Sequence, residues 1–509
     1  MKKISKKQSR RNIKKRKSKV AKRHGKAGSW SKQSAPMFGS GKIHYEVGAN
    51  IDAMSYGGMA PIHRLVTKLG LPDRINSDLK LLKRHLPYHE SDHVLNMAYN
   101  VLCGGTRLED IERLRHDTAY MNALGADLIP DPTTAGDFTR RFEEADVVTL
   151  METINSVRSQ LWNGRAAELL GPVTYLDVDG TIAPTYGECK AGMDMSYKGI
   201  WGYAPLIVSI ANTKEVLYVV NRSGNTPSHA DAATWIDKAI AQISPYTQRI
   251  CLRGDTAYSL TENFDRWAES IDFVLGMSCN AKMQSCAEAL PAEAWSRLER
   301  KPSYETLTDE SRTRYQRNEK EHIVKEREYL NLRLNYEDIA EFDYQPGKCS
   351  QPYRVVALRK NISKMKGEDA LIDEIRYFFY ITTRRDLTAT EIVYCANERC
   401  DQENIIEQLK NGVNAMRMPL YDLVSNWAYM VIAALAWNIK SWFAMMMHLK
   451  ADRQTYINME FRRFFNSIIL IPCHVIRRAR GIVVRIIGYE PTLDRLFSAW
   501  NTIESTSFG

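Results

Sequence analysis

The segment TYLDVDGT, residues 174–181, decides how this chain folds. It is a short run of apolar and β-branched residues that stops at Gly180, and Asp177 and Asp179 stand two positions apart within it. Side chains two apart on a strand share one face of a sheet. The segment therefore predicts a strand that carries a carboxylate to its end. We favour Asp179 for a functional role, because Gly180 and Thr181 follow it where the strand stops, and Asp177 for a supporting or alternative one.

The residues after this strand alternate between strand-like and helical patterns. Two more apolar runs follow, then a helical segment, a fourth strand, a short helix and a fifth strand. The segments are APLIVSIAN (204–212), EVLYVVNRSG (215–224), HADAATWIDKAIAQI (229–243), QRICLRGD (248–255), ENFDRWAES (262–270) and DFVLGMS (272–278). Three strands, a crossover helix and two further strands match a ribonuclease H-like mixed sheet, so we expect an α/β fold.

Two more acidic residues stand where such a sheet would place them. Asp255 follows the fourth strand and is flanked by small residues, although an aspartate in a strand-to-helix turn is common. Glu403 lies in a helical segment, where Arg399, Glu403 and Lys410 fall on one face at 3.6 residues per turn. The alternative for Arg399 and Glu403 is an ordinary surface ion pair four residues apart.

Carboxylates of this kind are the ligands that hard divalent cations prefer. Two such cations can activate an attacking oxygen and stabilise a leaving one at phosphorus. Asp179, Asp255 and Glu403 therefore predict a metal site for phosphoryl transfer on nucleic acid.

The basic character of the chain is concentrated at its start. The 509 residues carry a formal net charge of +10, but residues 1–45 hold sixteen Lys or Arg and no acidic residue, which leaves 54 basic and 60 acidic residues beyond them. Such a segment should be disordered when free and should bind phosphate non-specifically. The alternative is a solubilising tail.

The composition of the chain argues against a membrane protein and against a protein built around structural zinc. With 44% hydrophobic and 26% charged residues the chain is an ordinary globular protein. The apolar stretch 424–449 is interrupted by Asn426, Asn438, Lys440 and Ser441, so we expect a buried helix and no membrane span. Nine scattered cysteines without a C-x-x-C pair indicate free thiols in a reducing compartment and argue against structural zinc. His85, His89 and His93 recur every four residues, but Pro87 interrupts a common helix, and we interpret them as surface or core histidines.

Basic residues outside the tail mark two further surfaces. DPTTAGDFTRRFEEAD (131–146) predicts a helix start that displays Arg140 and Arg141, either toward a DNA groove or simply toward solvent. The segment FRRFFNSIILIPCHVIRRARGIVVRIIGY (461–489) adds Arg477, Arg478 and Arg480 as a second DNA-facing set.

These patterns divide the chain into six expected parts. They are a basic disordered tail and linker (1–58), a helical DNA-binding and dimerisation domain (59–165), a first ribonuclease H-like part (166–280), a β-containing insertion (281–375), a second ribonuclease H-like part with the Glu403 helix (376–450) and a basic C-terminal region (451–509).

The sequence resembles the DDE transposases of bacterial insertion sequences that carry a Y-R-E-K motif. The resemblance rests on the D-G-T strand end, the second aspartate and the Arg399-Glu403-Lys410 helix. GTRLEDIERLRHDTAY (105–120), DPTTAGDFTRRFE (131–143) and IPCHVIRRARGIVVRI (471–486) look most like the insertion-sequence thirteen-eighty group. One departure is that Ala396 stands where the motif has tyrosine, with Tyr394 two residues earlier.

The resemblance implies a cut-and-paste transposase of the bacterial cytoplasm, associated with the nucleoid. It would bind double-stranded DNA at terminal inverted repeats as a homodimer that pairs two ends. Two Mg²⁺ ions, replaceable by Mn²⁺, would be held by Asp179, Asp255 and Glu403, while Arg399 and Lys410 contact phosphate. Trp295, Tyr304 and Tyr315 could hold a flipped base, or could simply be packed aromatics.

Two other classes remain open. One is a DNA-binding protein of transposase descent that has lost catalysis, against which the intact acidic trio argues. The other is a ribonuclease H-like host nuclease acting on RNA–DNA hybrids or junctions, which would not need the long insertion and the basic tail.

Overall fold

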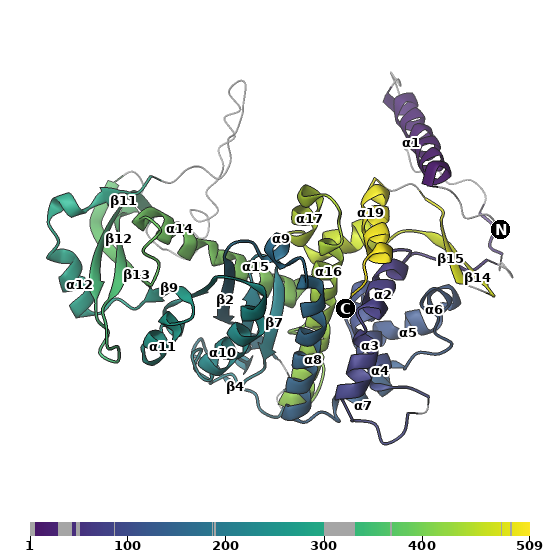
Figure 1. Ribbon diagram of the computed structural model, residues 1–509, viewed down its shortest axis with the longest axis horizontal. Coiled ribbons are helices and arrows are strands. Elements are labelled where there is room, and N and C mark those ends of the chain that lie inside the picture. The colour runs from purple at the N-terminus through teal and green to yellow at the C-terminus, as the bar shows by residue number, and fades with distance from the viewer. Residues whose placement is uncertain are drawn as a thin grey trace. The chain divides into compact units, whose positions relative to one another are not determined.

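The fold is that of a computed structural model that describes residues 6–28, 43–46, 51–85, 87–185, 187, 190–299, 331–366, 369–479, 481–488 and 491–508. The chain divides into two compact units (Figure 1). Unit 1 comprises 1–163, 185–193 and 407–509, and unit 2 comprises 164–184 and 194–406. We describe each unit by itself.

Unit 2 is built on a large mixed sheet of nine strands. Their order is β10-β11-β12-β13-β9-β8-β2-β6-β7. The strands are β2 (Thr174–Gly180), β6 (Leu206–Ile210), β7 (Glu215–Val220), β8 (Ile250–Gly254), β9 (Asp272–Met277), β10 (Ser296–Arg297), β11 (Asn331–Tyr344), β12 (Tyr353–Lys366) and β13 (Asp369–Thr382). A small second sheet has the order β3-β5-β4, with β3 (Ala183–Pro184), β4 (Asp194–Met195) and β5 (Trp201–Tyr203).

The centre of the large sheet contains the strands that the sequence predicts. β2 pairs antiparallel with β6 and parallel with β8, and β8 pairs parallel with β9. These strands form because apolar side chains fill them: Leu176, Val178, Leu252 and Phe273 are all fully buried. The segment expected as an insertion continues the same sheet, because β13 pairs antiparallel with β9.

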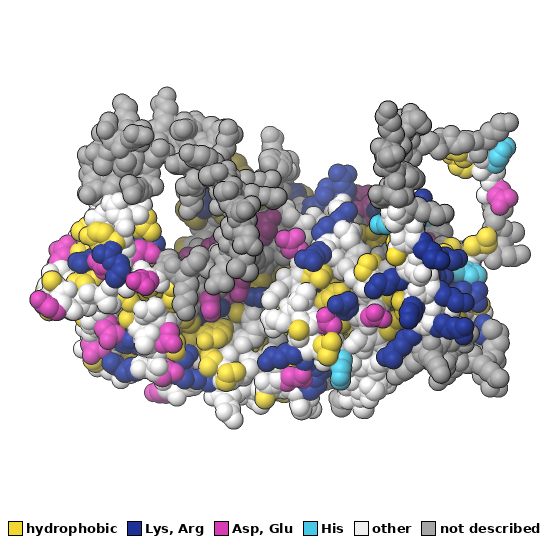
Figure 2. All heavy atoms as spheres, turned by 90° about the horizontal axis from the view of Figure 1, so that it is seen from above, with side chains coloured by type: hydrophobic (Ala, Val, Ile, Leu, Met, Phe, Trp, Pro, Cys, Tyr) yellow, Lys and Arg dark blue, Asp and Glu magenta, His cyan; other side chains and the backbone are white. Residues whose placement is uncertain are grey.

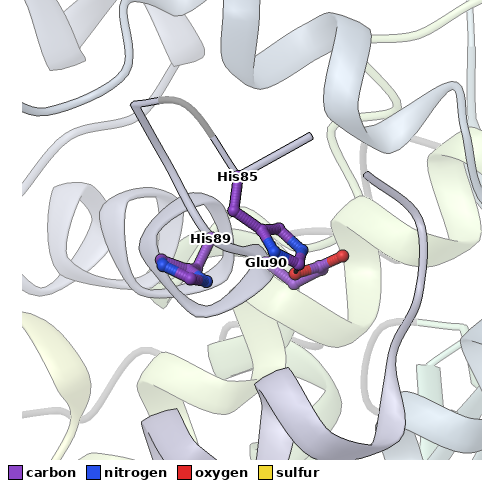
Figure 3. Close-up of side chains that lie close together, drawn as sticks. All are labelled: His85, His89 and Glu90. Atoms are coloured by element: carbon purple, nitrogen blue, oxygen red, sulfur yellow. Dashed lines mark ion pairs between the residues drawn. The ribbon is translucent and has the colours of Figure 1, made fainter. Parts of the chain in front are cut away.

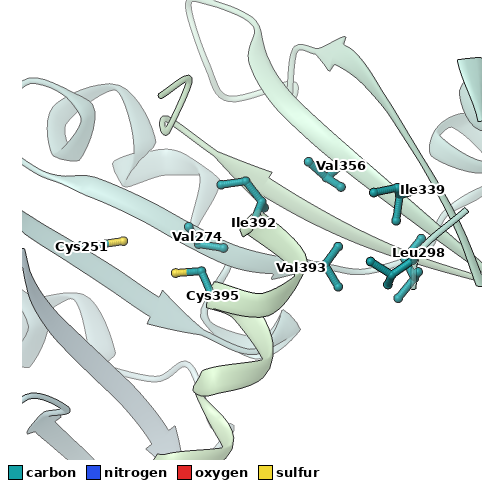
Figure 4. Close-up of a cluster of buried hydrophobic side chains, with 9 residues drawn as sticks. Cys251, Val274, Leu298, Ile339, Val356, Ile392, Val393 and Cys395 are labelled. Atoms are coloured by element: carbon teal, nitrogen blue, oxygen red, sulfur yellow. The ribbon is translucent and has the colours of Figure 1, made fainter. Parts of the chain in front are cut away.

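Helices cover this sheet. They are α9 (Ala166–Leu170), α10 (Ala232–Ile243), α11 (Phe264–Ala268), α12 (Ala281–Glu288), α14 (Ala389–Glu398) and α15 (Cys400–Glu407). α10 packs on β6 and β7, and α14 packs on β9, β11 and β12. Figure 4 shows α14 laying Ile392, Val393 and Cys395 against Cys251 of β8 and Val274 of β9. α14 begins at a capping box, in which Thr388 Oγ1 accepts the Glu391 N–H and Glu391 accepts the Thr388 N–H.

Unit 1 is mainly helical. Its helices are α1 (Lys6–Gly28), α2 (Met59–Lys68), α3 (Leu71–Asp78), α4 (Glu90–Leu102), α5 (Ile111–Arg115), α6 (Thr118–Leu124), α7 (Pro132–Thr139), α8 (Glu144–Trp162), α16 (Leu423–Met445), α17 (Lys450–Ile457), α18 (Phe461–Phe464) and α19 (Leu493–Ser505). A three-stranded sheet of order β1-β14-β15 joins β1 (Ala53–Met54) to the hairpin β14 (Cys473–Arg478) and β15 (Gly481–Ile486).

α16 is the buried helix expected from the apolar stretch 424–449. It packs against α2, α4, α8 and α17, and its polar residues Asn426, Asn438, Lys440 and Ser441 are buried as well. Asn426 donates to the Leu420 carbonyl and Lys440 donates to the Ile457 carbonyl, whereas the Ser441 hydroxyl has no hydrogen-bond partner among the described residues. Within the described ranges, no helix has the length and apolar character that a bilayer crossing requires.

The basic N-terminal segment differs from its prediction. We expected residues 1–58 to be disordered, but residues 6–28 form α1. That prediction rested on the low apolar content and on repulsion between like charges, whereas Lys, Arg, Gln and Ala are all good helix formers, and the segment has no Pro and no Gly before Gly25. Arg16 also donates from Nη1 to the carbonyls of Ile486, 3.1 Å away, and Gly488, at the end of the β14–β15 hairpin.

Candidate active site

The two predicted strand aspartates lie at the same end of neighbouring parallel strands. In the β2–β8 register Asp177 is paired with Arg253, so Asp179 and Asp255 each follow two residues further on. Asp179 is the penultimate residue of β2, and Asp255 caps a short 3₁₀ turn, where its Oδ1 accepts the Ala257 N–H at 2.9 Å. The fold therefore brings together two carboxylates that are 76 positions apart in the sequence.

The Asp179 carboxyl is electrostatically perturbed. Burial raises its pKa to about 6, with the nearby Asp255 charge adding to the rise and Arg399 opposing it. Arg399 Nη1 donates to Asp179 Oδ2 at 2.9 Å, and the Gly180 N–H donates to Oδ1 at 2.8 Å. The side chain of Asp179 keeps 17% of its surface exposed, so it remains reachable from solvent.

Asp177 has a different environment from Asp179. It is fully buried, and Arg253 donates to both of its oxygens, from Nε at 2.7 Å and from Nη2 at 2.9 Å. Both oxygens are thus occupied, which makes Asp177 a supporting residue and does not favour the alternative of a metal ligand.

The Asp177–Arg253 pair reaches the end of α14. Arg253 Nη1 lies 3.3 Å from both the Cys395 carbonyl and Glu398 Oε2, and its guanidinium stacks on the Tyr175 ring at 4.6 Å. Glu398 immediately precedes Arg399 in the sequence. The contacts of Arg253 with Cys395 and Glu398 therefore hold the backbone next to Arg399, whose side chain bonds Asp179.

The segment with Glu403 is anchored beside β2. In α15, the buried Gln402 bonds Ser209 and donates to the Ile207 carbonyl at 3.2 Å. Ile207 is the residue paired with Asp179 across β2 and β6. Lys214 also holds α15 through an ion pair with Asp401 at 2.7 Å. Glu403 is exposed and follows directly after Gln402, so it belongs to the same end of the sheet as the two aspartates.

The predicted single helical stripe needs correction. α14 ends at Glu398, Arg399 is its C-cap and α15 starts at Cys400. Lys410 lies in a π-helical turn, η6 (Gln408–Gly412), and belongs to unit 1. A π turn has a wider period than 3.6 residues, so the spacing that put Arg399, Glu403 and Lys410 on one face does not apply.

The three predicted carboxylates do not form a compact ligand cluster. In the described part of the chain, the group of three ligand atoms within 4.8 Å of one another is that of His85, His89 and Glu90, and not that of Asp179, Asp255 and Glu403. Asp179 does have a direct contact with Arg399, at 2.9 Å, and an electrostatic interaction with Asp255.

A residue that sequence analysis missed is Tyr258. It is fully buried, its hydroxyl has no hydrogen-bond partner within the described residues, and burial and the Asp179 charge raise its pKa. A Cβ added to Gly180 would meet this hydroxyl at 3.0 Å. Nothing in the sequence singles out Tyr258, but Arg253 could have been found, since a charged residue in an apolar strand needs a buried partner.

The aromatic candidates fall in different places. Tyr394 donates to the Glu299 carbonyl at 3.0 Å, and Ala396 packs against the core cluster of Figure 4. Trp295 is half-buried, with the Arg359 guanidinium 4.1 Å from its ring centre. Tyr304 and Tyr315 lie outside the described residues.

The basic candidates lie in unit 1. Arg140 and Arg141 are exposed just after α7, which begins in the segment predicted as a helix start and has Asp131 as its N-cap, and Arg140 pairs with Asp137. Arg477 and Arg478 are exposed at the end of β14, and Arg477 pairs with Asp127 at 3.4 Å. Arg480 lies outside the described residues. Figure 2 shows Lys and Arg side chains gathered on the visible face in the part of the molecule that carries β14 and β15.

A known family matches nearly the whole chain. The family model described as transposase DDE domain, group 1, matches residues 47–507. Because the match spans most of the sequence, the chain belongs to this family of transposases. Families of this kind use divalent metals with acidic side chains.

Comparisons with curated sequences and with solved structures give less information about this chain than the family model does. No curated protein sequence matches significantly. A solved structure with some similarity is a cryo-EM synaptic complex of piggyBac transposase with hairpin DNA, at 10% sequence identity and a TM-score of 0.35, covering 82% of this chain and 80% of that chain. A TM-score at this level carries no argument about the fold, so family membership rests on the family model.

Proposed function

We propose that this protein is an active DNA transposase that cleaves DNA at the ends of its element and joins the 3′-hydroxyls to target DNA. Asp179, Asp255 and Glu403 are its catalytic carboxylates, in a ribonuclease H-like core formed by β7, β6, β2, β8 and β9. The observation that carries this proposal is the pairing of Asp179 with Asp255 at the ends of two parallel strands, because family members need acidic ligands in such a place.

The residues fit divalent metal ions of the Mg²⁺ type. Two carboxylates brought together repel each other, which is one reason why the pKa of Asp179 rises to about 6. The buried Tyr258 hydroxyl, which has no hydrogen-bond partner in the described part of the chain, faces Gly180 beside them. Oxygen donors and surplus negative charge suit Mg²⁺, with Mn²⁺ as a substitute.

Asp179, Asp255 and Glu403 would hold two such ions. When bound, the ions would activate the attacking oxygen and stabilise the leaving oxygen at phosphorus. Because the Glu403 carboxylate is not clustered with the aspartates, metal binding would have to draw the α15 end of the site toward β2 and β8.

The chain's own residues would prepare this site. The Asp177–Arg253 pair would fix the junction of α14 and α15, and Arg399 would balance the charge of Asp179 until metal arrives. Arg399 would then be released to contact a DNA phosphate, since guanidinium groups match phosphate oxygens well.

DNA would also be contacted away from the carboxylates. Arg140, Arg141, Arg477, Arg478 and Arg480 would bind phosphates, as would Lys410, while Trp295 would contact a flipped base. Arg359 already stacks on Trp295, so a base would have to replace that guanidinium. We further propose a homodimer that pairs two ends, action in the bacterial cytoplasm and a place in the insertion-sequence thirteen-eighty group.

The direct test is Glu403→Gln with Asp401→Asn as its matched control. Both changes remove one charge from α15, but Asp401 pairs with Lys214 and has no role in the proposed site. Glu403→Gln should abolish Mg²⁺-dependent cleavage of terminal-repeat DNA and leave DNA binding intact, whereas Asp401→Asn should cleave normally. Cleavage by Glu403→Gln would show that the third ligand is misassigned.

A second test separates the alternatives. The wild-type protein should nick terminal-repeat DNA with Mg²⁺. Binding of that DNA without nicking would instead indicate a silent DNA-binding protein, and cleavage of RNA–DNA hybrids without preference for repeat ends would indicate a host nuclease.

A further inference from the structure

Three side chains in unit 1 form a group with the chemistry of a transition-metal site. They are His85, His89 and Glu90, whose ligand atoms all lie within 4.8 Å of one another (Figure 3). His85 and His89 belong to the connection between α3 and α4, and Glu90 is the first residue of α4. His85 and His89 are exposed and His93 is buried, as expected for surface and core histidines, but the sequence did not indicate that Glu90 lies beside the two exposed rings.

His93 is removed from this group by its packing. Its ring stacks on Phe138 with 4.4 Å between centroids and 7° between planes, and the ring is buried. Burial lowers the pKa of His93 to about 4. Pro87, which prevents a common helix, is also what lets the chain turn so that His85 approaches the start of α4.

Glu90 is prepared to act as a ligand. Its side chain is 1% exposed, and its Oε1 accepts the N–H groups of Leu81 at 3.1 Å and Leu82 at 3.0 Å. Its Oε2 is buried and receives no backbone N–H within the described residues, and His85 Nε2 lies 3.2 Å from it. One oxygen is thus fixed by the backbone, and the other is directed at the histidines.

The distances suit one metal ion. Zinc binds nitrogen and oxygen at about 2.0–2.1 Å in a tetrahedron, which places neighbouring ligand atoms about 3.3 Å apart. The 3.2 Å between His85 Nε2 and Glu90 Oε2 already matches this spacing. The rings of His85 and His89 stack with 4.6 Å between centroids, both side chains are exposed, and the ligand atom of His89 lies within 4.8 Å of those of His85 and Glu90. His89 is also the N-cap residue of α4, so binding a metal would require its ring to leave the capping contact with the Asp92 backbone.

We propose that His85, His89 and Glu90 bind one Zn²⁺ ion, with solvent as the fourth ligand. Two imidazoles and a carboxylate form a donor set that zinc uses in proteins, whereas Mg²⁺ prefers oxygen alone. This site is separate from the carboxylates of unit 2 and does not depend on the proposed transposase reaction.

The ion would stabilise the connection between α3 and α4. Next to the ligands, Lys83 and Arg84 of this connection line a cavity of about 500 Å³ together with Arg141. By tying His85 and His89 to the buried Glu90, zinc would hold the backbone that carries the two basic residues. The ion would thus hold the backbone beside one of the surfaces that carries a predicted DNA contact, and its solvent position would stay open to exchange.

The binding test uses the full chain with Asp179→Asn and Glu403→Gln, which removes acidic ligands of unit 2. After dialysis against Zn²⁺ with excess Mg²⁺, this protein should retain one equivalent of zinc, and Co²⁺ should give a visible absorption band typical of nitrogen ligands. Adding His85→Gln should weaken zinc binding by about 100-fold or more, since even changes outside a ligand set cost 10–100-fold.

His116→Gln is the matched control. His116 is an exposed histidine that also pairs with a glutamate, Glu112, at 2.7 Å, but no third ligand atom completes a group with them in the described part of the chain. It should leave zinc binding unchanged. Equal zinc content in the His85→Gln and His116→Gln proteins, or no retained zinc in the parent, would overturn the proposal.

A second measurement detects the ion at the predicted place. Trypsin cuts after Lys83 and Arg84, so Zn²⁺ should slow cleavage at these two bonds in the parent protein, and EDTA should reverse the effect. His85→Gln and His89→Gln should remove this protection without changing cleavage elsewhere. Cleavage at these bonds that is insensitive to Zn²⁺ in the parent would contradict the structural role.

Discussion

The strand half and the helix half of the candidate active site are held in different ways. Asp179 and Asp255 follow from the register of two parallel strands, which is determined by a ladder of hydrogen bonds and a buried pair. Arg399 and Glu403 instead lie on either side of the junction between α14 and α15, which depends on side-chain contacts from Arg253 and Gln402. We therefore expect the strand half, which carries the carboxylates of Asp179 and Asp255, to be rigid. We expect the helix half, which carries Arg399 and Glu403, to change position when a metal ion or DNA binds.

The largest expected effect comes from the rigid half. Asp179→Asn or Asp255→Asn should each reduce Mg²⁺-dependent strand cleavage by about 1,000-fold or more, because the ions would lose a charged ligand. Cleavage of a labelled terminal-repeat duplex measures this loss, with DNA binding followed by gel shift as the control. If Asp179→Asn and Asp255→Asn lost less cleavage activity than Glu403→Gln, the strand half would not be the rigid half of the site.

The buried pair should matter for stability more than for chemistry. Asp177→Asn leaves the Arg253 charge buried without its partner, and such losses cost about 3–5 kcal/mol. Urea unfolding of unit 2 should show this decrease, while Asp179→Asn, two residues along the same strand, should not. If Asp177→Asn were as stable as wild type, Arg253 would not hold the α14–α15 junction in the way described.

The raised pKa of Asp179 gives a pH dependence. In the folded protein its carboxyl favours the protonated form up to about pH 6, compared with 3.8 for an ordinary aspartate. The metal-free protein should therefore lose about 2–3 kcal/mol of stability as pH rises from 4 through 6, on the scale of 1.36 kcal/mol per pKa unit. The same loss should be absent in Asp179→Asn, as measured by urea unfolding at several pH values.

Metal should compete with the proton for Asp179. At low Mg²⁺, cleavage should rise with pH through about 6, and higher Mg²⁺ should move this rise to lower pH. A pH profile that does not move with Mg²⁺ concentration would mean that Asp179 is not a ligand.

The smallest expected effect lies outside both halves. Deleting residues 2–26 removes most of the basic N-terminal segment and should weaken DNA binding mainly at low salt, with a shallower dependence on salt concentration. Fluorescence anisotropy at several salt concentrations measures this slope. An unchanged slope would assign α1 to contacts within unit 1, such as those of Arg16, and not to DNA.

Much of this structure follows from local patterns. The central strands, the α7 cap at Asp131 and the buried helix α16 were all predictable, because apolar periodicity and capping residues act over a few positions. Asp179 and Asp255 were predictable for the same reason, since each ends an apolar strand.

Long-range contacts were not predictable in this way. The pairing of Asp177 with Arg253 and of Arg399 with Asp179 depends on strand register and on a helix that arrives late in the chain. No Gly or Pro marks the end of α14 at Arg399 in the sequence. The π turn that contains Lys410 likewise interrupts a segment whose spacing resembles that of a regular α-helix. The approach of Glu90 to His85 and His89 was not predictable either, because it depends on how the connection between α3 and α4 folds.

The contacts of Arg253 and Arg399 also determine when the site can exist during synthesis. Asp177 bonds Arg253 across 76 positions, Arg253 reaches Glu398 across 145, and Arg399 reaches Asp179 across 220. A nascent chain that has not yet extended past Arg399 contains both strand aspartates but neither Glu403 nor the counter-ion of Asp179. Under the proposed function, truncated products that end within the insertion lack the third catalytic carboxylate and should not cleave DNA, because Glu403 is added only once nearly four-fifths of the chain has been synthesised.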